Sequence, residues 1–197
     1  MKRLSIKRNN FHDSTGSLEE QLPKKFSVSF KETWINNKPN VLVVLNDNMQ
    51  VGDVINDNAY SEDFYRYHDV FHYSFASLLG WSPCIRSMLK CKRKSNPVID
   101  EIEDGARATI TEEALSLLIF NEAKRKNLFE KSEKISKTTL RIIKEMTEPF
   151  EVKVRTTKDW ESTILKAYAM FRLLIKNNGG KVKFDGINKT LEYIHLN

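Results

Sequence analysis

The chain has 197 residues, of which 40% are hydrophobic and 29% are charged, so it can bury a core and is not a disordered chain. Its two cysteines, Cys84 and Cys91, exclude a disulfide framework and a four-cysteine zinc site, and no apolar run approaches the ~20 residues of a membrane span. We therefore expect a soluble, cytoplasmic protein, and its formal net charge of +6 suits an anionic partner.

The N-terminal part divides into a polar arm and a small β unit. Residues 1–22 show no sustained periodicity and are predicted to form a flexible arm ahead of a single domain over residues 23–197. Within 23–58, apolar side chains alternate over residues 24–31, and residues 41–45 form a β-branched run. The polar connection at 36–39 is typical of a turn, so this part should form a β hairpin or meander. Residues 53–60 read as a polar connection or the rim of a site.

Residues 62–178 carry the spacing of helices. Apolar side chains recur every three or four residues from Phe64 to Leu78, and Gly80 ends this pattern. Asn96 and Pro97 would begin a long helix that reaches about residue 127, and further helices are expected over 134–146 and 160–174. Residues 179–197 form a C-terminal extension with a short edge strand. The expected fold is mainly α: a four-helix bundle with an N-terminal β hairpin and a small C-terminal β element.

Acidic side chains cluster on the long helix predicted from residue 96. At ~100° per residue, Glu101, Asp104 and Glu112 share one stripe with apolar residues, while Glu103 and Glu113 lie within a second apolar arc. Buried carboxylates repel one another unless a cation compensates them, and Mg²⁺ prefers oxygen ligands. The pattern thus predicts a divalent-metal site; the alternative is a solvated acidic face.

The preceding helix offers imidazoles. Asp69 and His72 lie one turn apart, with His68 beside them. Asp69 would complete the carboxylate set, and His72 would be a ligand, a proton shuttle or a residue that orients water. The alternative is a pair of histidines that bond to the acids of the neighbouring helix. Both interpretations place the two helices face to face.

A basic cluster connects these helices. If it clamps phosphates, it lies close to the metal; as an ordinary basic loop it contributes only solubility or attraction to nucleic acid. The expected phosphate-binding residues are Arg86, Lys90, Lys92, Arg93 and Lys94.

Three segments resemble the MazG-like nucleoside triphosphate pyrophosphohydrolases: YRYHDVFHYSFASLLGWSP, KRKSNPVIDEIEDGARATITEEA and the upstream VGDVINDNAY. The resemblance covers the chain from about residue 22 onward. It implies a helical bundle that binds Mg²⁺ through acids and cleaves an NTP or dNTP to NMP and pyrophosphate, commonly as an oligomer. Asp100, Glu101 and Asp104 match a DExxD version of the family's first acidic element, but its second element, ExxD on the next helix, is not found where expected. A role in antiviral defence or nucleotide-pool control is a further implication.

The resulting hypothesis is Mg²⁺-dependent pyrophosphohydrolysis, with Mn²⁺ as a second possible ion. The expected metal ligands are Asp69, Glu101, Asp104 and Glu112, and the expected catalytic residues are His72 and Glu113. His68 and Glu103 would contact and orient these residues without binding the metal or the substrate. Partners would be the nucleotide and either further copies of the chain or a protein encoded in the same operon, with neither a membrane nor nucleic acid as partner. The alternatives are a catalytically inactive nucleotide-sensing or interaction module and a metal phosphohydrolase of the HD type, built on the His68-Asp69 pair.

Overall fold

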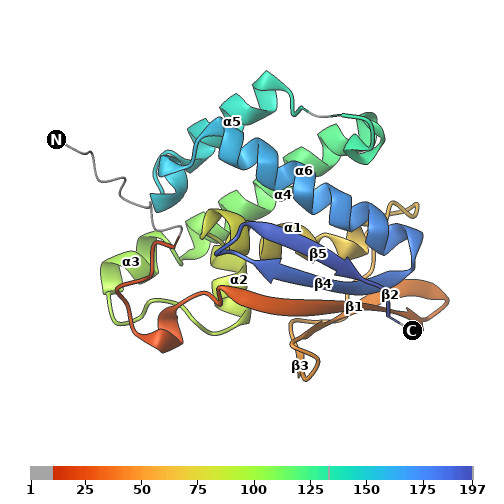
Figure 1. Ribbon diagram of the computed structural model, residues 1–197, viewed down its shortest axis with the longest axis horizontal. Helices are drawn as coiled ribbons and strands as arrows, with labels where there is room; N and C mark the ends of the chain where they lie inside the picture. The colour runs from red at the N-terminus through yellow and green to blue at the C-terminus, as the bar shows by residue number, and fades with distance from the viewer. Residues whose placement is uncertain (1–10, 133, 197) are drawn as a thin grey trace.

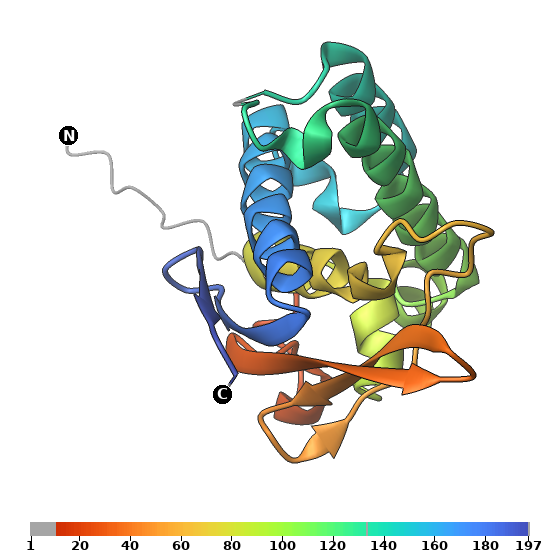
Figure 2. The ribbon, with the colours of Figure 1, turned by 90° about the vertical axis from the view of Figure 1, so that its right-hand side faces the viewer.

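The computed structural model describes residues 11–132 and 134–196, which form an antiparallel sheet with helices gathered on one side of it (Figures 1 and 2). The sheet has five strands in the order β3-β2-β1-β4-β5. The strands are β1 (Lys25–Ile35), β2 (Lys38–Leu45), β3 (Met49–Gln50), β4 (Gly179–Asp185) and β5 (Thr190–Ile194). The α-helices are α1 (Asp69–Ser74), α2 (Pro83–Met88), α3 (Pro97–Ile102), α4 (Ala106–Arg125), α5 (Lys137–Thr147) and α6 (Thr157–Lys176).

The predicted N-terminal hairpin is present. Alternate residues of β1, among them Val28 and Phe30, are fully buried, and β2 buries Val41 and Val43 in the same core. Asn36 and Asn37 connect the strands with φ of 52° and 57°, as a two-residue hairpin turn requires. The alternation of the sequence therefore sets which face of the hairpin meets the helices.

The prediction of a mainly α four-helix bundle is wrong, because the C-terminal extension completes a sheet. β4 is an interior strand that pairs with β1 on one side and β5 on the other, not the edge strand expected. Gly179 and Gly180, which mark the end of a helix in the sequence, begin this strand with φ of 119° and 146°. A Cβ at Gly179 would lie 2.4 Å from the carbonyl oxygen of Phe30, so only glycine allows β4 to approach β1 this closely.

The predicted first helix is divided into three short parts. A 3₁₀ turn (Tyr65–Tyr67) leads into α1, and a π-helical turn (Phe75–Leu79) follows it and ends at Gly80, which has a φ of 71°. α6 packs against α1 through aromatic rings, with the Phe71 and Tyr168 centroids 4.6 Å apart. Every residue of α1 is buried as a result, so its polar side chains lie in the interior.

The long helix predicted from residue 96 is also interrupted. α3 ends at Ile102, and α4 begins after Gly105, which occupies its N-cap with an extended backbone (φ −85°, ψ −177°). Asp104 consequently lies in the break between two helices, and the stripe expected to join it to Glu101 and Glu112 does not form.

Gly105→Ala is expected to lower the free energy of unfolding by about 1–3 kcal/mol. A Cβ at this position would lie 2.0 Å from the carbonyl oxygen of Glu101, and backbone atoms cannot move aside without distorting the break. Urea denaturation of the variant measures the loss. Gly16→Ala is the matched control, because a Cβ there meets its nearest atom at 3.4 Å. Equal stabilities of the two variants would show that the break tolerates a side chain.

The last two helices match their predicted positions. Ser136 caps α5 through its hydroxyl, and Thr156 and Asp159 form a capping box at the start of α6. α6 lies across β4 and β5 and carries the centre of the core, including the fully buried Trp160 and Phe171.

Of the predicted N-terminal arm, residues 1–10 lie outside the described part of the chain, and both ends of the segment 11–22 are buried, while residues 15–19 are exposed. Phe11, Asp13 and Leu22 are buried. The carboxylate of Asp13 accepts the backbone N–H of Leu22 and pairs with Arg86. This part of the arm therefore contributes to the core and its ion pairs.

His12 makes the stability of this packing pH-dependent. Burial lowers the pKa of His12 and outweighs the opposite effect of Glu151. The unfolded chain therefore takes up the proton first as the pH falls below about 6.5, and the free energy of unfolding decreases until the pH passes the lower pKa of the folded state. Urea denaturation at pH 8 and pH 5.5 should show a smaller decrease in His12→Asn than in the unchanged protein. An equal decrease in both would contradict a neutral buried imidazole.

Candidate functional site

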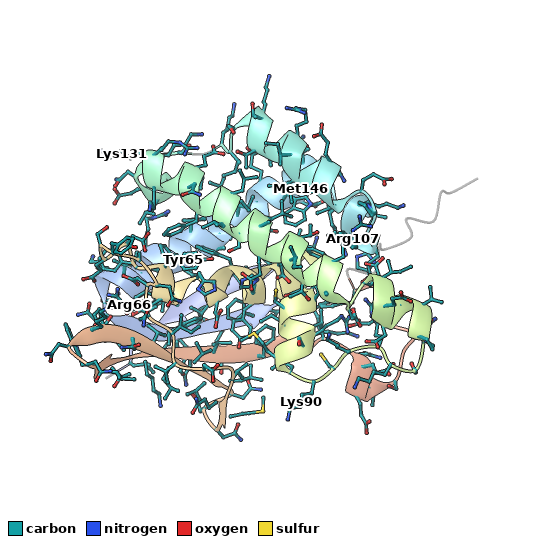
Figure 3. All side chains as sticks on the ribbon, turned by 180° about the vertical axis from the view of Figure 1, so that it is seen from behind. Tyr65, Arg66, Lys90, Arg107, Lys131 and Met146 are labelled. Atoms are coloured by element: carbon teal, nitrogen blue, oxygen red, sulfur yellow. The ribbon has the colours of Figure 1, made fainter. Side chains whose placement is uncertain are left out.

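A polar cluster lies where α1 meets the middle of α4, and it contains residues that the sequence placed on two facing helices. α1 contributes Asp69 and His72, His68 directly precedes α1, and α4 contributes Glu112 and Glu113. α4 crosses α1 on the side of the molecule where Tyr65 lies, as Figure 3 shows. The expected face-to-face arrangement of the two helices is present.

Glu112 fixes the ring of His72. The Nδ1 atom of His72 lies 2.8 Å from Oε1 of Glu112, and a carboxylate can only accept, so Nδ1 carries the proton. Glu112 is fully buried and also accepts the hydroxyl of Ser82 at 2.6 Å and the backbone N–H of Cys84 at 2.9 Å. Its oxygens are thus occupied by His72 and by donors at the start of α2, while Nε2 of His72 faces Glu113, whose Oε2 is 3.5 Å away.

His68 is oriented in the same manner by a backbone carbonyl. Its Nδ1 lies 2.9 Å from the carbonyl oxygen of Tyr65, and its ring stacks on that of Tyr65 with centroids 4.2 Å apart. This assigns the proton to Nδ1 and leaves Nε2 to face Asp69, whose Oδ1 is 3.5 Å away. The Asp57 carboxylate accepts the backbone N–H groups of Phe64 and Arg66, and so fixes the chain that enters α1.

Two buried atoms of the cluster have no hydrogen-bond partner among the described residues: Oδ2 of Asp69 and Nε2 of His72. Asp69 is 3% and His72 is 1% exposed, so bulk water does not satisfy them. One ligand atom from each of His68, Asp69 and His72 lies within 4.8 Å of the others. Two imidazoles and a carboxylate that converge fit a divalent cation, and such an ion would displace the proton from Nε2 of His72 on binding.

A second group, His72, Cys84 and Glu112, is equally close. Its members are already bonded to one another through the side chain of Glu112, and burial together with the Glu112 charge raises the pKa of the Cys84 thiol. Cys84 therefore stays protonated, and its thiol faces Glu113 Oε1 at 3.5 Å.

The charges of the cluster are strongly coupled. Burial acts to lower the pKa of His72, but the carboxylates of Glu112 and Glu113 raise it well above its ordinary value. The interaction with His72 lowers the pKa of Glu113 to about 2, so Glu113 is ionised at neutral pH. Its Oε2 lies 3.5 Å from Nε2 of His72, and its side chain is 48% exposed. Glu113 thus joins the buried cluster to solvent.

The other acids of the predicted site lie elsewhere. Asp104 is fully buried in an ion-pair network, where it pairs with Arg93 at 2.6 Å and lies 3.5 Å from Arg86. Arg93 also pairs with Glu151, whose backbone N–H is accepted by Glu103. The two arginines and Asp104 therefore pair with one another. They form a network that is separate from the cluster of His72 and Asp69.

The three predicted phosphate-binding lysines share a groove with Glu101. The groove has a volume of about 650 Å³ and is lined by Ser87, Lys90, Lys92, Lys94, Asp100, Glu101, Gly105 and Ala106. Ala106 precedes Glu113 by two turns of α4, so the two lie on the same side of the helix, about 10 Å apart. Lys90 marks this end of the molecule in Figure 3.

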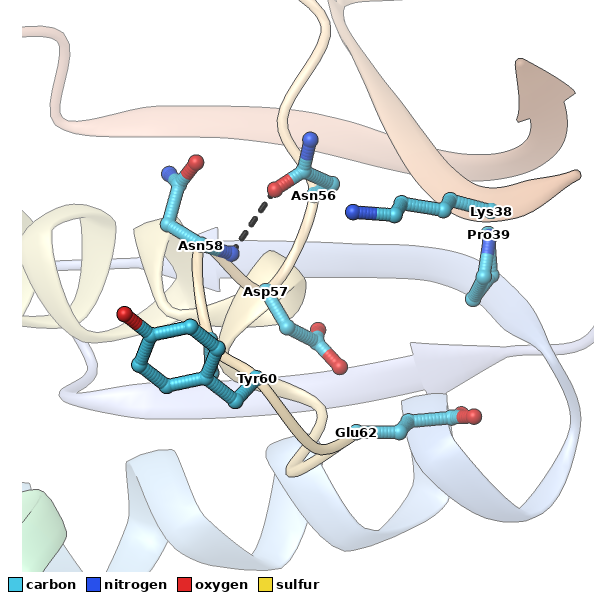
Figure 4. A pocket seen from close by; sticks show the side chains of 8 residues that line it. Lys38, Pro39, Asn56, Asp57, Asn58, Tyr60 and Glu62 are labelled. Atoms are coloured by element: carbon cyan, nitrogen blue, oxygen red, sulfur yellow. Dashed lines mark hydrogen bonds between the residues drawn. The ribbon is translucent and has the colours of Figure 1, made fainter. Parts of the chain in front are cut away.

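A further groove of about 660 Å³ lies between the β1–β2 hairpin and residues 56–62 (Figure 4). Asn58 donates its backbone N–H to the side chain of Asn56, and the carboxylates of Asp57 and Glu62 pair with Arg66. Residues 53–60, expected to be a connection or a rim, form one wall of this groove. Both carboxylates of this groove are therefore held by Arg66, and among the described residues it offers no group of metal-binding residues.

Sequence reasoning missed the groups that orient the two imidazoles. Ser82 and the backbone N–H of Cys84 bind Glu112, and the carbonyl of Tyr65 binds His68. Ser82 before Pro83 is a recognisable helix start, and its hydroxyl does accept the N–H of Ile85. The contacts to Glu112 have no signal in the sequence, because they depend on how the elements pack, whereas the His68 contact is local to the turn that begins at Tyr65.

One comparison with known proteins, a family model, agrees with the resemblance. No helix of the described residues is both long and apolar enough to cross a membrane. No curated protein and no solved structure matches the chain. The family model described as the MazG C-terminal domain matches residues 7–197, which confirms the MazG-like assignment and supports a relationship to nucleotide pyrophosphohydrolases. The chain therefore belongs to the MazG C-terminal domain family.

Proposed function

We propose that the protein hydrolyses a phosphoanhydride bond of a nucleotide with the help of a divalent cation, releasing NMP and pyrophosphate from an NTP or dNTP. The observation that carries the proposal is the convergence of His68, Asp69 and His72, with unpartnered buried atoms, beside the partly exposed Glu113. The family match supports the substrate class. The carboxylates in the sequence predict Mg²⁺ as the ion, with Mn²⁺ as a second possible ion.

The burial of each residue in the cluster indicates its role. His68, Asp69 and His72 face inward and would hold the cation, which neutralises phosphate charge and polarises the phosphorus–oxygen bonds. Glu113 is ionised and reaches solvent, so it can accept a hydrogen bond from the attacking water and orient it. Glu112 does not touch the substrate in this scheme; it holds His72 in place.

The lysine groove would bind the phosphate chain. It lies about two turns of α4 from Glu113, a separation that a nucleotide with several phosphates can bridge. Phosphoryl transfer depends chiefly on positioning and on neutralising charge, which exposed lysines supply as mobile point charges. Glu101 and Asp100 line the same groove and are available to a second cation bound with the phosphates.

The test is product formation. The purified protein is incubated with a panel of NTPs and dNTPs and with Mg²⁺ or Mn²⁺, and NMP and pyrophosphate are quantified. We expect both products in equal amounts with at least one nucleotide. Orthophosphate with NDP would place the cleavage at another bond. No product from folded protein at high concentration would reject hydrolysis.

Lys90, Lys92 and Lys94 should affect binding before turnover. Changing all three to Ala is expected to raise KM severalfold with little change in kcat, because their charges act on bound and reacting phosphates alike. The KM of the unchanged protein should rise with salt more steeply than that of the variant. The matched control is Lys131→Ala, an exposed lysine far along the chain (Figure 3). Unchanged KM in the triple variant would place the phosphates elsewhere.

The sensing-module alternative predicts nucleotide binding without product formation. A sensor binds nucleotide and gains thermal stability from it but forms no NMP, and changes at Glu113 alter affinity instead of turnover. The HD-type alternative needs histidine ligands from other elements, whereas His12 lies beside Glu151 and Arg155, and His195 lines a groove with Phe30. The His68-Asp69 pair is part of the candidate metal site, but among the described residues no histidine of another element joins it.

A further inference from the structure

We propose that His68, Asp69 and His72 form a site for a first-row transition ion such as Zn²⁺, Mn²⁺ or Co²⁺, and that Mg²⁺ does not occupy it. The inference identifies the ion of the proposed function. It depends on that function only because both use the same three residues. It differs from the all-carboxylate site that the sequence suggests, since only Asp69 of the predicted acidic ligands joins the two imidazoles, and Glu112 bonds to Nδ1 of His72 instead.

The donor atoms decide the class of ion. One ring nitrogen of each histidine and a carboxylate oxygen of Asp69 lie within 4.8 Å of one another and can approach one ion, and imidazole nitrogen is a good ligand for Zn²⁺ and its neighbours but a poor one for Mg²⁺. Two histidines and one carboxylate leave coordination positions open, as in catalytic metal centres. Oε2 of Glu113 lies 3.5 Å from Nε2 of His72, beside the place where the ion would bind.

Contacts behind the imidazoles have the form that metal-binding histidines require. The buried Glu112 accepts the Nδ1–H of His72, and the Tyr65 carbonyl accepts that of His68, so Nε2 is the ring atom left in each to bind an ion, which would displace the Nε2 proton of His72. Ser82 and the Cys84 backbone in turn hold Glu112. Asp69 Oδ2 and His72 Nε2 are buried without a partner, which an ion between them would correct.

Metal binding can be measured without nucleotide. Protein stripped with a chelator is dialysed separately against Zn²⁺, Mn²⁺, Co²⁺ and Mg²⁺, and bound ion is counted by elemental analysis alongside thermal unfolding. We expect one ion per chain for the transition metals, a raised melting temperature, and a Co²⁺ absorption spectrum typical of nitrogen ligands. Mg²⁺ should neither bind to the chelator-treated protein at this site nor compete with Co²⁺.

Four variants locate the ion. His72→Ala and the nearly isosteric Asp69→Asn should abolish both the bound ion and the stability gain. Glu112→Gln, which changes a positioning residue without removing a ligand, should weaken affinity roughly 10–100-fold and shift the Co²⁺ spectrum. His195→Ala is the control, because His195 is exposed and lies outside the cluster. Circular dichroism verifies folding, and Asp69→Asn and Glu112→Gln keep the test valid if His72→Ala does not fold.

Metal binding and hydrolysis can fail independently in these experiments, so the results distinguish the metal site from the proposed function. Transition-ion binding that depends on Asp69 and His72, without any hydrolysis, supports the site and rejects the proposed function. Mg²⁺-supported hydrolysis that survives His68→Ala, with no bound transition ion, supports the function and overturns the site. Binding that is lost equally in His195→Ala, or that no variant changes, also overturns it.

Discussion

Glu113→Ala is expected to reduce nucleotide hydrolysis by roughly 10²–10⁴-fold while changing nucleotide affinity little. Glu113 is the one acid of the cluster whose side chain is both ionised and 48% exposed, so it can meet a water molecule that the buried Asp69 and Glu112 cannot reach. Removing its carboxylate leaves His72 held by Glu112, and the ligand atoms of the site stay in place. The loss should therefore appear in kcat and not in KM.

Steady-state kinetics of the variant, with product NMP as the readout, measure this effect. Glu148→Ala is the matched control, since Glu148 is exposed and its carboxylate makes, within residues 11–132 and 134–196, only a long ion pair of 3.9 Å with Lys153. A fall in kcat of less than about tenfold would remove Glu113 from the reaction, given what a positioned acid or base contributes. Glu113→Gln distinguishes charge from hydrogen bonding, because the amide can still accept a hydrogen bond from water.

Asp104→Ala is expected to lower the free energy of unfolding by about 3–5 kcal/mol, the loss that follows when one partner of a buried ion pair is removed. Asp104 is fully buried and accepts the backbone N–H and the guanidinium of Arg93, with Arg86 3.5 Å away. Its removal leaves two buried arginines with Asp13 and Glu151 as their remaining acidic partners. The break between α3 and α4 also loses the bond that joins it to Arg93.

Urea denaturation of the metal-free protein measures this loss. If Asp104 were a metal ligand, as the sequence predicts, Asp104→Ala would not lower the free energy of unfolding of the metal-free protein. Removing one of several repelling carboxylates would leave that protein as stable or more stable, and would abolish stabilisation by metal. Asp104→Asn keeps the shape and removes the charge, so it should be destabilised as well. A decrease below about 1 kcal/mol in both variants would contradict a structural role.

The sequence by itself determined the local elements and part of the site. Period-two alternation fixed the hairpin of β1 and β2, capping residues fixed the starts of α5 and α6, and Gly80 fixed the end of the first helical segment. Three-residue spacing placed Asp69 and His72 on one face, and the prediction that this face meets the acids of the next helix agrees with the His72–Glu112 contact. These features depend on neighbours within a few residues, which periodicity records.

Only the tertiary structure decided the sheet and the division of the charged residues. Gly179 and Gly180 read as a helix stop because a glycine pair signals backbone freedom, but their use as the start of an interior strand depends on β1, which lies more than a hundred residues earlier in the chain. Asp104 and Glu112 read as one stripe until Gly105 interrupts the helix, after which Asp104 bonds Arg93 and Glu112 bonds His72. A buried charge takes whichever partner the packing brings within reach, and a pattern along one helix does not contain that partner.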